Sequence, residues 1–311
     1  MKILVTGASG FVGRIAVEAL LTAGHSVRAA VRAPQPGLPV ETVVVGGLDP
    51  ATDWSVALDG VQAVVHLAAR VHVMRDHLGS ADEFRRTNTE GTLQIARAAA
   101  KSGARRFVFV SSIKVNGEAT NDCPFRADDD PHVIDAYGRS KLEAEIGLSQ
   151  IAGLEPVIIR PPLVHGPGAK GNLARLCRLA QSGLPVPFDG ISNRRDIVGV
   201  ANLANLIERC LWHPAAPRQV FLVSDGQPLS TAQLFRLIAA AIGRPARVFN
   251  VPVELMRVIA RPIGMSEELD RLTQSLEVDI TKTREMLGWS PPVSTATGIE
   301  EMARAFVSGA K

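Results

Sequence analysis

The stretch "KILVTGASGFVG", residues 2–13, decides the fold of this chain. The short run at residues 2–5 stops at a turn with glycine at positions 7, 10 and 13. After the turn, apolar residues recur at helical spacing until Gly24, so the sequence predicts a strand, a tight turn and a helix. Glycines in such a turn let the backbone approach a pyrophosphate, which the amide groups at the start of the helix can hold. The residues predicted to meet it are Gly7, Ser9, Gly10, Phe11, Val12 and Gly13.

The alternation of strand and helix continues through the first half of the chain. Short runs that are apolar on both faces are typical of a parallel sheet covered on both sides. The predicted strands span residues 26–31, 42–45, 62–69, 106–112 and 156–160, and the predicted helices span 83–101 and 136–151. The fold class is therefore α/β, a doubly wound parallel sheet of the Rossmann type.

After Arg160 the chain changes to the Pro/Gly-rich segment "PPLVHGPGAKGN". Predicted helices at 172–182, 197–211, 231–242 and 252–262 then mix with short strands such as "QVFLVS". We expect a dinucleotide-binding domain over 1–163 and a second, smaller mixed α/β substrate lobe over 164–311, with the chain re-entering the first sheet around 196–224. Residues 70–82 follow a strand end and are expected to form either a flap over the ligand or a solvated loop.

Composition excludes several classes of protein. The 311 residues are 46% apolar and carry a formal charge of only +3, with lysines and arginines scattered, so nucleic acid is not expected as a partner. No apolar run is long enough to span a bilayer or to act as a signal peptide, which favours a cytoplasmic protein. Cys123, Cys177 and Cys210 have no metal-binding or redox spacing, so we expect no metal site and assign these cysteines no function.

The end of the second predicted strand bears on the choice of dinucleotide. A NAD-binding chain normally places Asp or Glu there for the ribose 2′-hydroxyl, whereas this chain has Val31 followed by Arg32. A guanidinium can pair with a 2′-phosphate, which favours NADP(H) and leaves NAD possible; alternatively, Arg32 is a solvated strand-end residue. Asp49, after the third strand, is a candidate for the adenine amine or for a loop cap.

Tyr137 is the only tyrosine in the chain, and Lys141 follows it by four residues. In a helix over 136–151 these two side chains share a face. A phenol has a pKa of about 10, but an ammonium and a positively charged nicotinamide favour the phenolate. Ser112 ends the strand at 106–112, where it can hydrogen-bond the same substrate oxygen. The three residues indicate an acid/base site for interconverting a carbinol and a ketone.

With these motifs assembled, the sequence resembles extended short-chain dehydrogenases/reductases of the nucleotide-sugar epimerase/dehydratase group. The resemblance runs the whole length of the chain. The segments that carry it are "TGASGFVG" at 6–13, "HLAA" at 66–69, "TNTEGT" at 87–92, "VSSIKVNGE" at 110–118, "YGRSK" at 137–141, "RPPLVHGPG" at 160–168 and "VDITKTREMLGW" at 278–289.

The resemblance implies roles for particular residues. Ser112, Tyr137 and Lys141 would be catalytic, with Lys141 also holding the nicotinamide ribose. Further cofactor contacts would come from Leu67, Ala68, Ala69, Asn88 and Pro161. The substrate, a UDP-linked sugar, would meet Ser112, Lys114, Asn172, Leu173 and Arg195, with Arg195 pairing with the diphosphate. The group also implies a homodimer formed through the helices at 83–101 and 136–151.

Three departures from the group's pattern narrow the reaction. Sugar 4,6-dehydratases place an Asp-Glu pair where this chain has Ile113 and Lys114, so dehydration is not expected. Leu163 stands where the group often has Asn, which removes one expected substrate contact. The third departure is the absent acid at Val31 and Arg32.

The absence of an acidic residue at Val31 and Arg32 favours a reductase over an epimerase. A 4-epimerase keeps one NAD bound and usually carries the Asp or Glu that binds the ribose 2′-hydroxyl. The leading hypothesis is NADP(H)-dependent reduction of the C4 ketone of a UDP-linked 6-deoxy-N-acetylhexosamine for surface-polysaccharide biosynthesis. The alternatives are a UDP-hexose 4-epimerase with bound NAD and, from a different class, a non-catalytic NADP-binding regulator.

Overall fold

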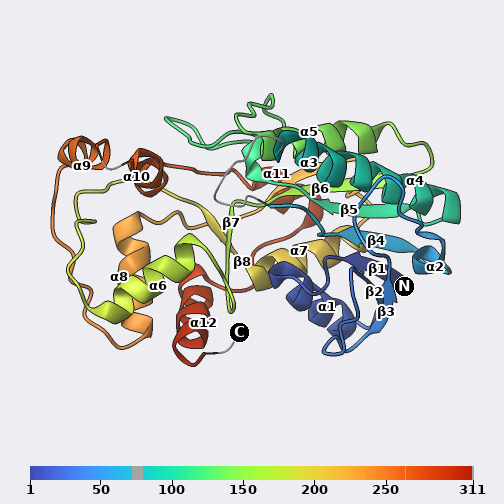
Figure 1. Ribbon diagram of the computed structural model, residues 1–311, viewed down its shortest axis with the longest axis horizontal. Coiled ribbons are helices and arrows are strands. Elements are labelled where there is room, and N and C mark those ends of the chain that lie inside the picture. The colour runs from blue at the N-terminus through green and yellow to red at the C-terminus, as the bar shows by residue number, and fades with distance from the viewer. Residues whose placement is uncertain (72–79, 263, 310–311) are drawn as a thin grey trace.

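A computed structural model describes residues 1–71, 80–262 and 264–309 (Figure 1). The flap expected at 70–82 falls mostly on residues 72–79, outside the described residues. The larger part of the molecule is a seven-stranded sheet in the order β3-β2-β1-β4-β5-β6-β9, and every pairing in it is parallel. Its strands are β1 (Lys2–Thr6), β2 (Ser26–Val31), β3 (Glu41–Val44), β4 (Ala63–His66), β5 (Arg106–Val110), β6 (Glu155–Arg160) and β9 (Val220–Leu222). This confirms the expected Rossmann-type fold class.

Helices cover both faces of this sheet, which is why its strands are apolar on both sides (Figure 1). On β1, Ile3 and Val5 point into one apolar core and Leu4 points into the other, as strand geometry requires. The first core is closed by α1 (Phe11–Thr22), α7 (Val200–Trp212) and α11 (Thr281–Leu287). The second is closed by α2 (Ser55–Leu58), α4 (Thr92–Ser102) and α5 (Ala136–Ser149).

A smaller lobe with its own apolar core lies beside the carboxyl ends of the strands. Three helices build that core, namely α6 (Asn172–Ser182), α8 (Thr231–Ala241) and α12 (Thr295–Val307). Between lobe and sheet runs a parallel pair of short strands, β7 (Leu163–His165) and β8 (Ile197–Gly199). Two more helices belong to this lobe: α9 (Val253–Ala260) lies at the end farthest from the large sheet, and α10 (Ser266–Thr273) lies between α9 and the sheet (Figure 1).

Two predicted helices differ in detail from the structure. The segment expected as one helix over 83–101 consists of α3 (Ser80–Phe84), a π-helical stretch η1 (Arg85–Gly91) and α4. Such π-helical turns are rare and often mark functional positions. The helix expected at 197–211 begins only at Val200, because Ile197–Gly199 pairs with β7. A short 3₁₀ turn, η2 (Ile113–Val115), follows β5.

Neither a membrane-crossing helix nor a metal cluster is found within residues 1–71, 80–262 and 264–309. No helix there is long and apolar enough to cross a membrane, and no group of three His, Cys, Asp or Glu side chains is placed to hold a metal ion. Cys177 and Cys210 are buried, and burial raises their pKa values to about 11 and about 12, which keeps both as thiols. Cys123 is exposed.

Candidate functional site

The glycine turn lies directly against the carboxyl end of β4. Gly7 has a φ of 70°, and a Cβ there would lie 2.8 Å from the Ala68 amide nitrogen. A Cβ on Gly13 would lie 2.1 Å from the Gly7 carbonyl oxygen, so this position also admits only glycine. Gly10 precedes α1, and no described side chain caps that end of the helix. The turn therefore offers helix amides and an open backbone, which fits a dinucleotide pyrophosphate.

His66, at the end of β4, fixes the segment that follows it. His66 is fully buried, with Nδ1 hydrogen-bonded to the Thr6 hydroxyl at 2.8 Å and Nε2 to the Thr92 hydroxyl at 3.0 Å. Burial, helped by nearby Lys141, lowers the pKa of His66 to about 3, so the imidazole is neutral. The Thr6 hydroxyl also accepts from the Ala68 amide at 3.2 Å. The network holds residues 67–69 beside the glycine turn.

Asn88, in the middle of η1, ties the chain after β4 to α5. Its Oδ1 accepts from the Arg70 amide at 2.7 Å, and its Nδ2 donates to the Arg70 carbonyl at 3.0 Å. The same Nδ2 donates to the Ser140 hydroxyl at 3.1 Å. Since Ser140 immediately precedes Lys141, Asn88 positions the predicted cofactor face and the predicted catalytic helix together.

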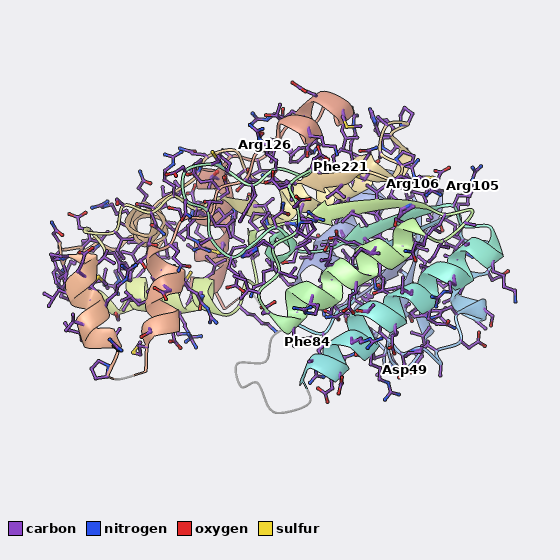
Figure 2. All side chains as sticks on the ribbon, turned by 90° about the horizontal axis from the view of Figure 1, so that it is seen from above. Asp49, Phe84, Arg105, Arg106, Arg126 and Phe221 are labelled. Atoms are coloured by element: carbon purple, nitrogen blue, oxygen red, sulfur yellow. The ribbon has the colours of Figure 1, made fainter. Side chains whose placement is uncertain are left out.

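The end of β2, which is expected to select between NAD and NADP(H), carries no acidic residue. β2 ends at the buried Val31, and Arg32 is exposed beyond it. Asp49, which is labelled in Figure 2, accepts from the Ala51 amide at 2.9 Å, and it pairs with Arg86 at 2.6 Å. The hydrogen bond from Ala51 and the Arg86 guanidinium hold the pKa of Asp49 below its usual range. The loop-capping role of Asp49 is therefore present, while an adenine contact stays a prediction.

Tyr137 and Ser112 meet where α5 begins beside the end of β5. Asp135 caps the helix by accepting from the Gly138 amide at 2.6 Å, which places Tyr137 in the first turn. The Tyr137 and Ser112 side chains are hydrogen-bonded. Phe84, labelled in Figure 2 near the start of α5, packs edge-on against the phenol ring at 6.0 Å. The phenol is thus held by packing on one side and by Ser112 on the other.

Burial sets the charge states of Tyr137 and Lys141. Burial raises the pKa of Tyr137 to about 12, the Asp135 carboxylate adds to this rise, and the Ser112 hydrogen bond opposes it. Lys141 is only 2% exposed; its Nζ donates to the Val110 carbonyl at 2.9 Å and lies 4.4 Å from the centre of the Phe109 ring. Burial lowers the pKa of Lys141 to about 7. The site therefore favours a protonated phenol until further positive charge is brought close.

One pocket of about 310 Å³ opens between the large sheet and the smaller lobe. The sequence-predicted residues that line it are Ser112, Lys114, Tyr137, Pro161, Asn172, Leu173 and Arg195. Arg195 is held in place because its Nη1 donates to the carbonyls of Arg271 and Gln274 at 3.2 and 3.0 Å. Leu163 also lines the wall, where it offers no hydrogen bond. The pocket joins the predicted acid/base pair to the predicted diphosphate arginine.

Two acidic residues, one in the pocket wall and one beside it, have no role in the predictions from the sequence. The Lys114 ammonium lies 2.5 Å from Asp135 and 2.9 Å from Glu118. A helix-capping aspartate just before the predicted helix, and a glutamate four residues after Lys114, were the signals available. Thr231 and Gln274 also line the pocket, and no local pattern marks them. Lys114 therefore neutralises part of the negative charge that Asp135 directs at Tyr137.

We expect Asp135→Asn to lower the pKa of Tyr137 by about one unit, because asparagine keeps the helix cap but removes the carboxylate. Lys114→Gln should raise that pKa, since Asp135 then loses its ammonium partner. Tyr137 is the only tyrosine, so tyrosinate absorbance read after a rapid pH jump reports this phenol alone. Asp59→Asn, which changes an exposed carboxylate beside α2, serves as the control. Identical titrations in all four proteins would contradict the electrostatic coupling.

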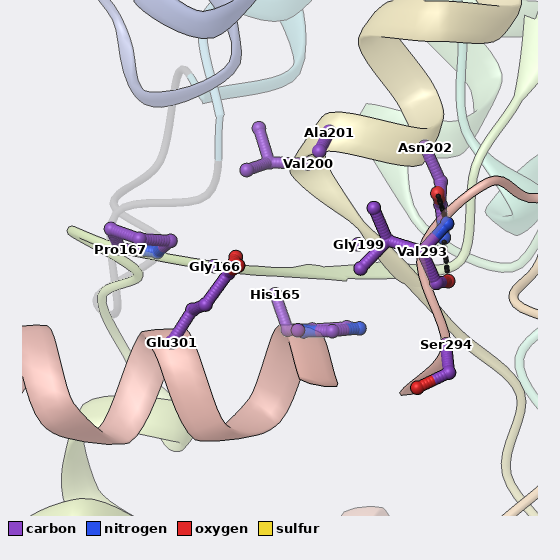
Figure 3. A pocket seen from close by; sticks show the side chains of 11 residues that line it. His165, Gly166, Pro167, Gly199, Val200, Ala201, Asn202, Val293, Ser294 and Glu301 are labelled. Carbon is purple, nitrogen blue, oxygen red and sulfur yellow. Dashed lines mark hydrogen bonds between the residues drawn. The ribbon is translucent and has the colours of Figure 1, made fainter. Parts of the chain in front are cut away.

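A second, small cavity of about 20 Å³ lies between β7, β8 and α12 (Figure 3). His165 Nε2 lies 2.7 Å from Asp225 there, and both side chains are almost fully buried. Asp225 also accepts from the Gly199 amide and from Asn202, at 2.8 and 2.7 Å. This volume holds about one water molecule, so the cavity is too small for a substrate.

The parallel sheet, the glycine turn and the serine, tyrosine and lysine at its edge define a Rossmann-type protein built for a dinucleotide. The chain belongs to the NAD dependent epimerase/dehydratase family, whose pattern matches residues 3–223. This confirms the resemblance drawn from the sequence.

The chain is similar along most of its length to proteins of known name or structure. A UDP-glucose 4-epimerase of Vibrio cholerae is 44% identical over 98% of this chain and 95% of its own length. A 2-alkyl-3-oxoalkanoate reductase of Stenotrophomonas maltophilia is 32% identical over 79% and 77%. The crystal structure of a short-chain dehydrogenase/reductase superfamily protein from Agrobacterium tumefaciens with bound NAD has a TM-score of 0.78 at 26% identity, covering 99% and 98% of the two chains.

Proposed function

We propose that this protein is an NAD-dependent enzyme that interconverts alcohol and ketone at C4 of a UDP-linked hexose, with 4-epimerisation as its overall reaction. The observation that carries the proposal is one pocket lined by Ser112, Tyr137 and Arg195. It combines an acid/base phenol with a guanidinium suited to a diphosphate. The relative at 44% identity, a UDP-glucose 4-epimerase, supports both the reaction and the UDP-hexose.

The dinucleotide, when bound, supplies the hydride acceptor and donor. Gly7, Gly10 and Gly13 leave the backbone open for its pyrophosphate, and the amides at the start of α1 face that space. Residues 67–69 would line its ribose side, because the His66 network holds them there. Lys141 would hold the nicotinamide ribose with the ammonium that now donates to the Val110 carbonyl. The NAD seen in the Agrobacterium structure supports this assignment.

Tyr137 carries the proton in both half-reactions. During oxidation the phenolate accepts the proton of the C4 hydroxyl while Ser112 hydrogen-bonds the same oxygen. During reduction the phenol returns the proton to the ketone oxygen. With a pKa of about 12, Tyr137 is ready to donate, and the positive charge of Lys141 makes proton acceptance easier.

Epimerisation also requires that the ketone intermediate present both faces to the same hydride donor. Arg195 and Asn172 would hold the nucleoside diphosphate at the far end of the pocket. Leu163 and Leu173 line the wall with apolar surface and bind no sugar hydroxyl. A hexose that is anchored through its diphosphate and held by few hydrogen bonds can rotate to present its other face without leaving the site.

The second candidate is NADPH-dependent reduction of the C4 ketone of a UDP-6-deoxy-N-acetylhexosamine for surface-polysaccharide biosynthesis. One observation favours it: β2 ends at the apolar Val31, and the exposed Arg32 follows where a 2′-phosphate would reach. The raised pKa of Tyr137 also suits a phenol that only donates. The Vibrio relative, a UDP-glucose 4-epimerase, supports epimerisation as the first candidate.

The nucleotide released on denaturing the purified protein separates the two reactions. An epimerase regenerates its cofactor in every cycle, so we expect NAD at about one per chain and interconversion of UDP-hexoses without added dinucleotide. An empty protein that oxidises NADPH only with a UDP-4-keto sugar would replace the epimerase by the reductase, and Arg32→Ala should then raise KM for NADPH. Absence of turnover with either substrate would point to the non-catalytic regulator.

The proposal also covers the roles of the two domains, the cellular location and the oligomeric state. Residues 1–163, with the returning α7 and β9, would bind the dinucleotide, and residues 164–311 would bind the nucleotide sugar. The protein would act in the cytoplasm as a homodimer paired through α4 and α5. Ile146 on α5 is 52% exposed, which supports this pairing surface.

A further inference from the structure

A buried ion pair joins α5 to β6 beside the predicted catalytic residues. Arg160, the last residue of β6, donates to the Glu145 carboxylate through Nε at 3.1 and 3.2 Å and through Nη2 at 2.6 Å. The Arg160 and Glu145 side chains are only 5% and 6% exposed. Replacing such a pair by apolar side chains is often neutral for stability or even stabilising, because burial of both charges is costly. Stability alone therefore does not explain why the chain keeps these two charges in its interior.

Glu145 connects the helix of Lys141 with the strand end of Ser112. It follows Lys141 by four residues on α5, and both residues are buried, so the two side chains share the inner face of the helix. The carboxylate also accepts a hydrogen bond from the Ser111 hydroxyl, and Ser111 directly precedes Ser112. Glu145 itself lies outside the wall of the substrate pocket, so it can influence the reaction only through these neighbours.

Arg160 is held from its other side, which fixes the ion pair in one position. Its Nη1 donates to Asn116 Oδ1 at 3.0 Å, and Asn116 Nδ2 donates to the Arg126 carbonyl at 2.8 Å. Asn116 directly follows η2, and Pro161, the residue after Arg160, lines the substrate pocket. The ion pair thus links the segments that follow β5 and β6 to α5. The guanidinium also supplies the counter-charge that a carboxylate needs at this depth.

The charge of Glu145 acts on the Lys141 ammonium. Burial lowers the pKa of Lys141 to about 7, and the negative charge of Glu145 works against that lowering. Other ionisable groups around the ammonium are His66 on β4, which is neutral, the Tyr137 phenol on the same helix, and Arg160, which lies beyond the carboxylate. Of these groups Glu145 is the one that carries negative charge, so it favours the charged form of Lys141.

We propose that Glu145 is a positioning residue for the acid/base site, which holds the Lys141 ammonium in place and in its charged form. It acts through its charge across one turn of α5, while its hydrogen bond with Ser111 ties the neighbouring strand end to the same carboxylate. The inference rests on the proposed function, because it gives Glu145 a task in the proton transfer that Tyr137 performs there. Loss of the charge at position 145 should therefore act on Lys141 first and on turnover second.

The first test measures the pKa of Lys141 directly, in the full chain without dinucleotide or substrate. Isotope labelling of the lysine Cε atoms gives NMR signals that move as each amine titrates, and Lys141→Met, which lacks one signal, assigns it. Glu145→Gln keeps the size and an acceptor oxygen but removes the charge, so we expect it to lower the pKa of Lys141 by about one unit. Glu143→Gln makes the same change two residues earlier on α5, where Glu143 accepts from the Thr89 hydroxyl at 3.3 Å, and should leave that pKa unchanged.

A second variant covers the case in which Glu145→Gln does not fold because Arg160 is left as an unpaired buried charge. Glu145→Gln/Arg160→Met removes both charges, and its Lys141 should still titrate at a lower pH than in the wild type. A pKa of Lys141 that stays at the wild-type value in the folded variants would overturn the proposal.

The second test follows turnover of a UDP-hexose across pH. Glu145→Gln should move the alkaline limb of the pH profile of kcat to lower pH, by about as much as the pKa of Lys141 falls, and should leave KM within about twofold. A loss of kcat by the same factor at every pH would instead mark the ion pair as a structural brace and overturn the proposal. Wild-type protein that turns over no UDP-hexose would refute the proposed function, while the titration of Lys141 without substrate still decides the role of Glu145.

Discussion

Tyr137→Phe is expected to lower kcat by about 10³-fold while leaving dinucleotide affinity within about twofold. Phenylalanine keeps the ring that packs edge-on against Phe84, so the fold at the start of α5 should not change. It removes the phenol hydroxyl that, in the proposed mechanism, moves a proton to and from the C4 oxygen of the sugar. Single-turnover kinetics and dinucleotide titration of the purified variant measure the two quantities separately.

Ser112→Ala provides the graded comparison for that variant. In the proposed mechanism the Ser112 hydroxyl orients the substrate oxygen but transfers no proton, so its loss should lower kcat less, by about 10- to 100-fold. Ser112 also hydrogen-bonds the phenol and lowers its pKa, so the variant's activity should need a higher pH for proton acceptance. Wild-type turnover by Tyr137→Phe would exclude the phenol as the acid/base and with it the proposed mechanism.

The parallel sheet and the positions of Ser112, Tyr137 and Lys141 could be predicted because each depends on a short stretch of sequence. A glycine turn between an apolar strand and a helix has one common structural meaning, and strands buried on both faces read as continuous apolar runs. Tyr137 and Lys141 are neighbours on one helix, so their shared face needed no tertiary information. Ser112 was predictable because strand ends in a parallel sheet meet at one edge.

The remaining contacts depend on tertiary packing between distant segments. Arg195 is oriented by carbonyls of Arg271 and Gln274, more than seventy residues farther along the chain. No periodicity in the sequence connects those positions. The same holds for His66, whose partners come from β1 and α4. The π-helical stretch around Asn88 was also hidden, because its apolar spacing still reads as a continuous helix.

Lys141→Met should abolish most activity and at the same time stabilise the protein in a pH-dependent way. Burial lowers the pKa of Lys141 from 10.5 to about 7 in the folded protein. Below pH 7 the ammonium is charged in both the folded and the unfolded chain, so the folded state carries the full cost of burying it. That cost falls as the pH rises from about 7 to 10.5 and is absent above that range. Methionine fills a similar volume without a charge.

The variant should therefore gain stability most at pH 6, on the order of 1–3 kcal/mol, and approach the wild type near pH 11. The lost hydrogen bond to the Val110 carbonyl offsets part of the gain, by about 1 kcal/mol. Urea unfolding of the apoprotein across this pH range measures the free energy of unfolding. Lys101→Met, at an exposed position near the end of α4, should change it little at any pH. If Lys141→Met is no more stable than the wild type at pH 6, the buried ammonium is fully compensated by its surroundings. In that case no catalytic role is needed to explain why the chain retains Lys141. A gain in stability together with a loss of turnover would instead mean that the chain keeps a destabilising buried charge because its activity requires it.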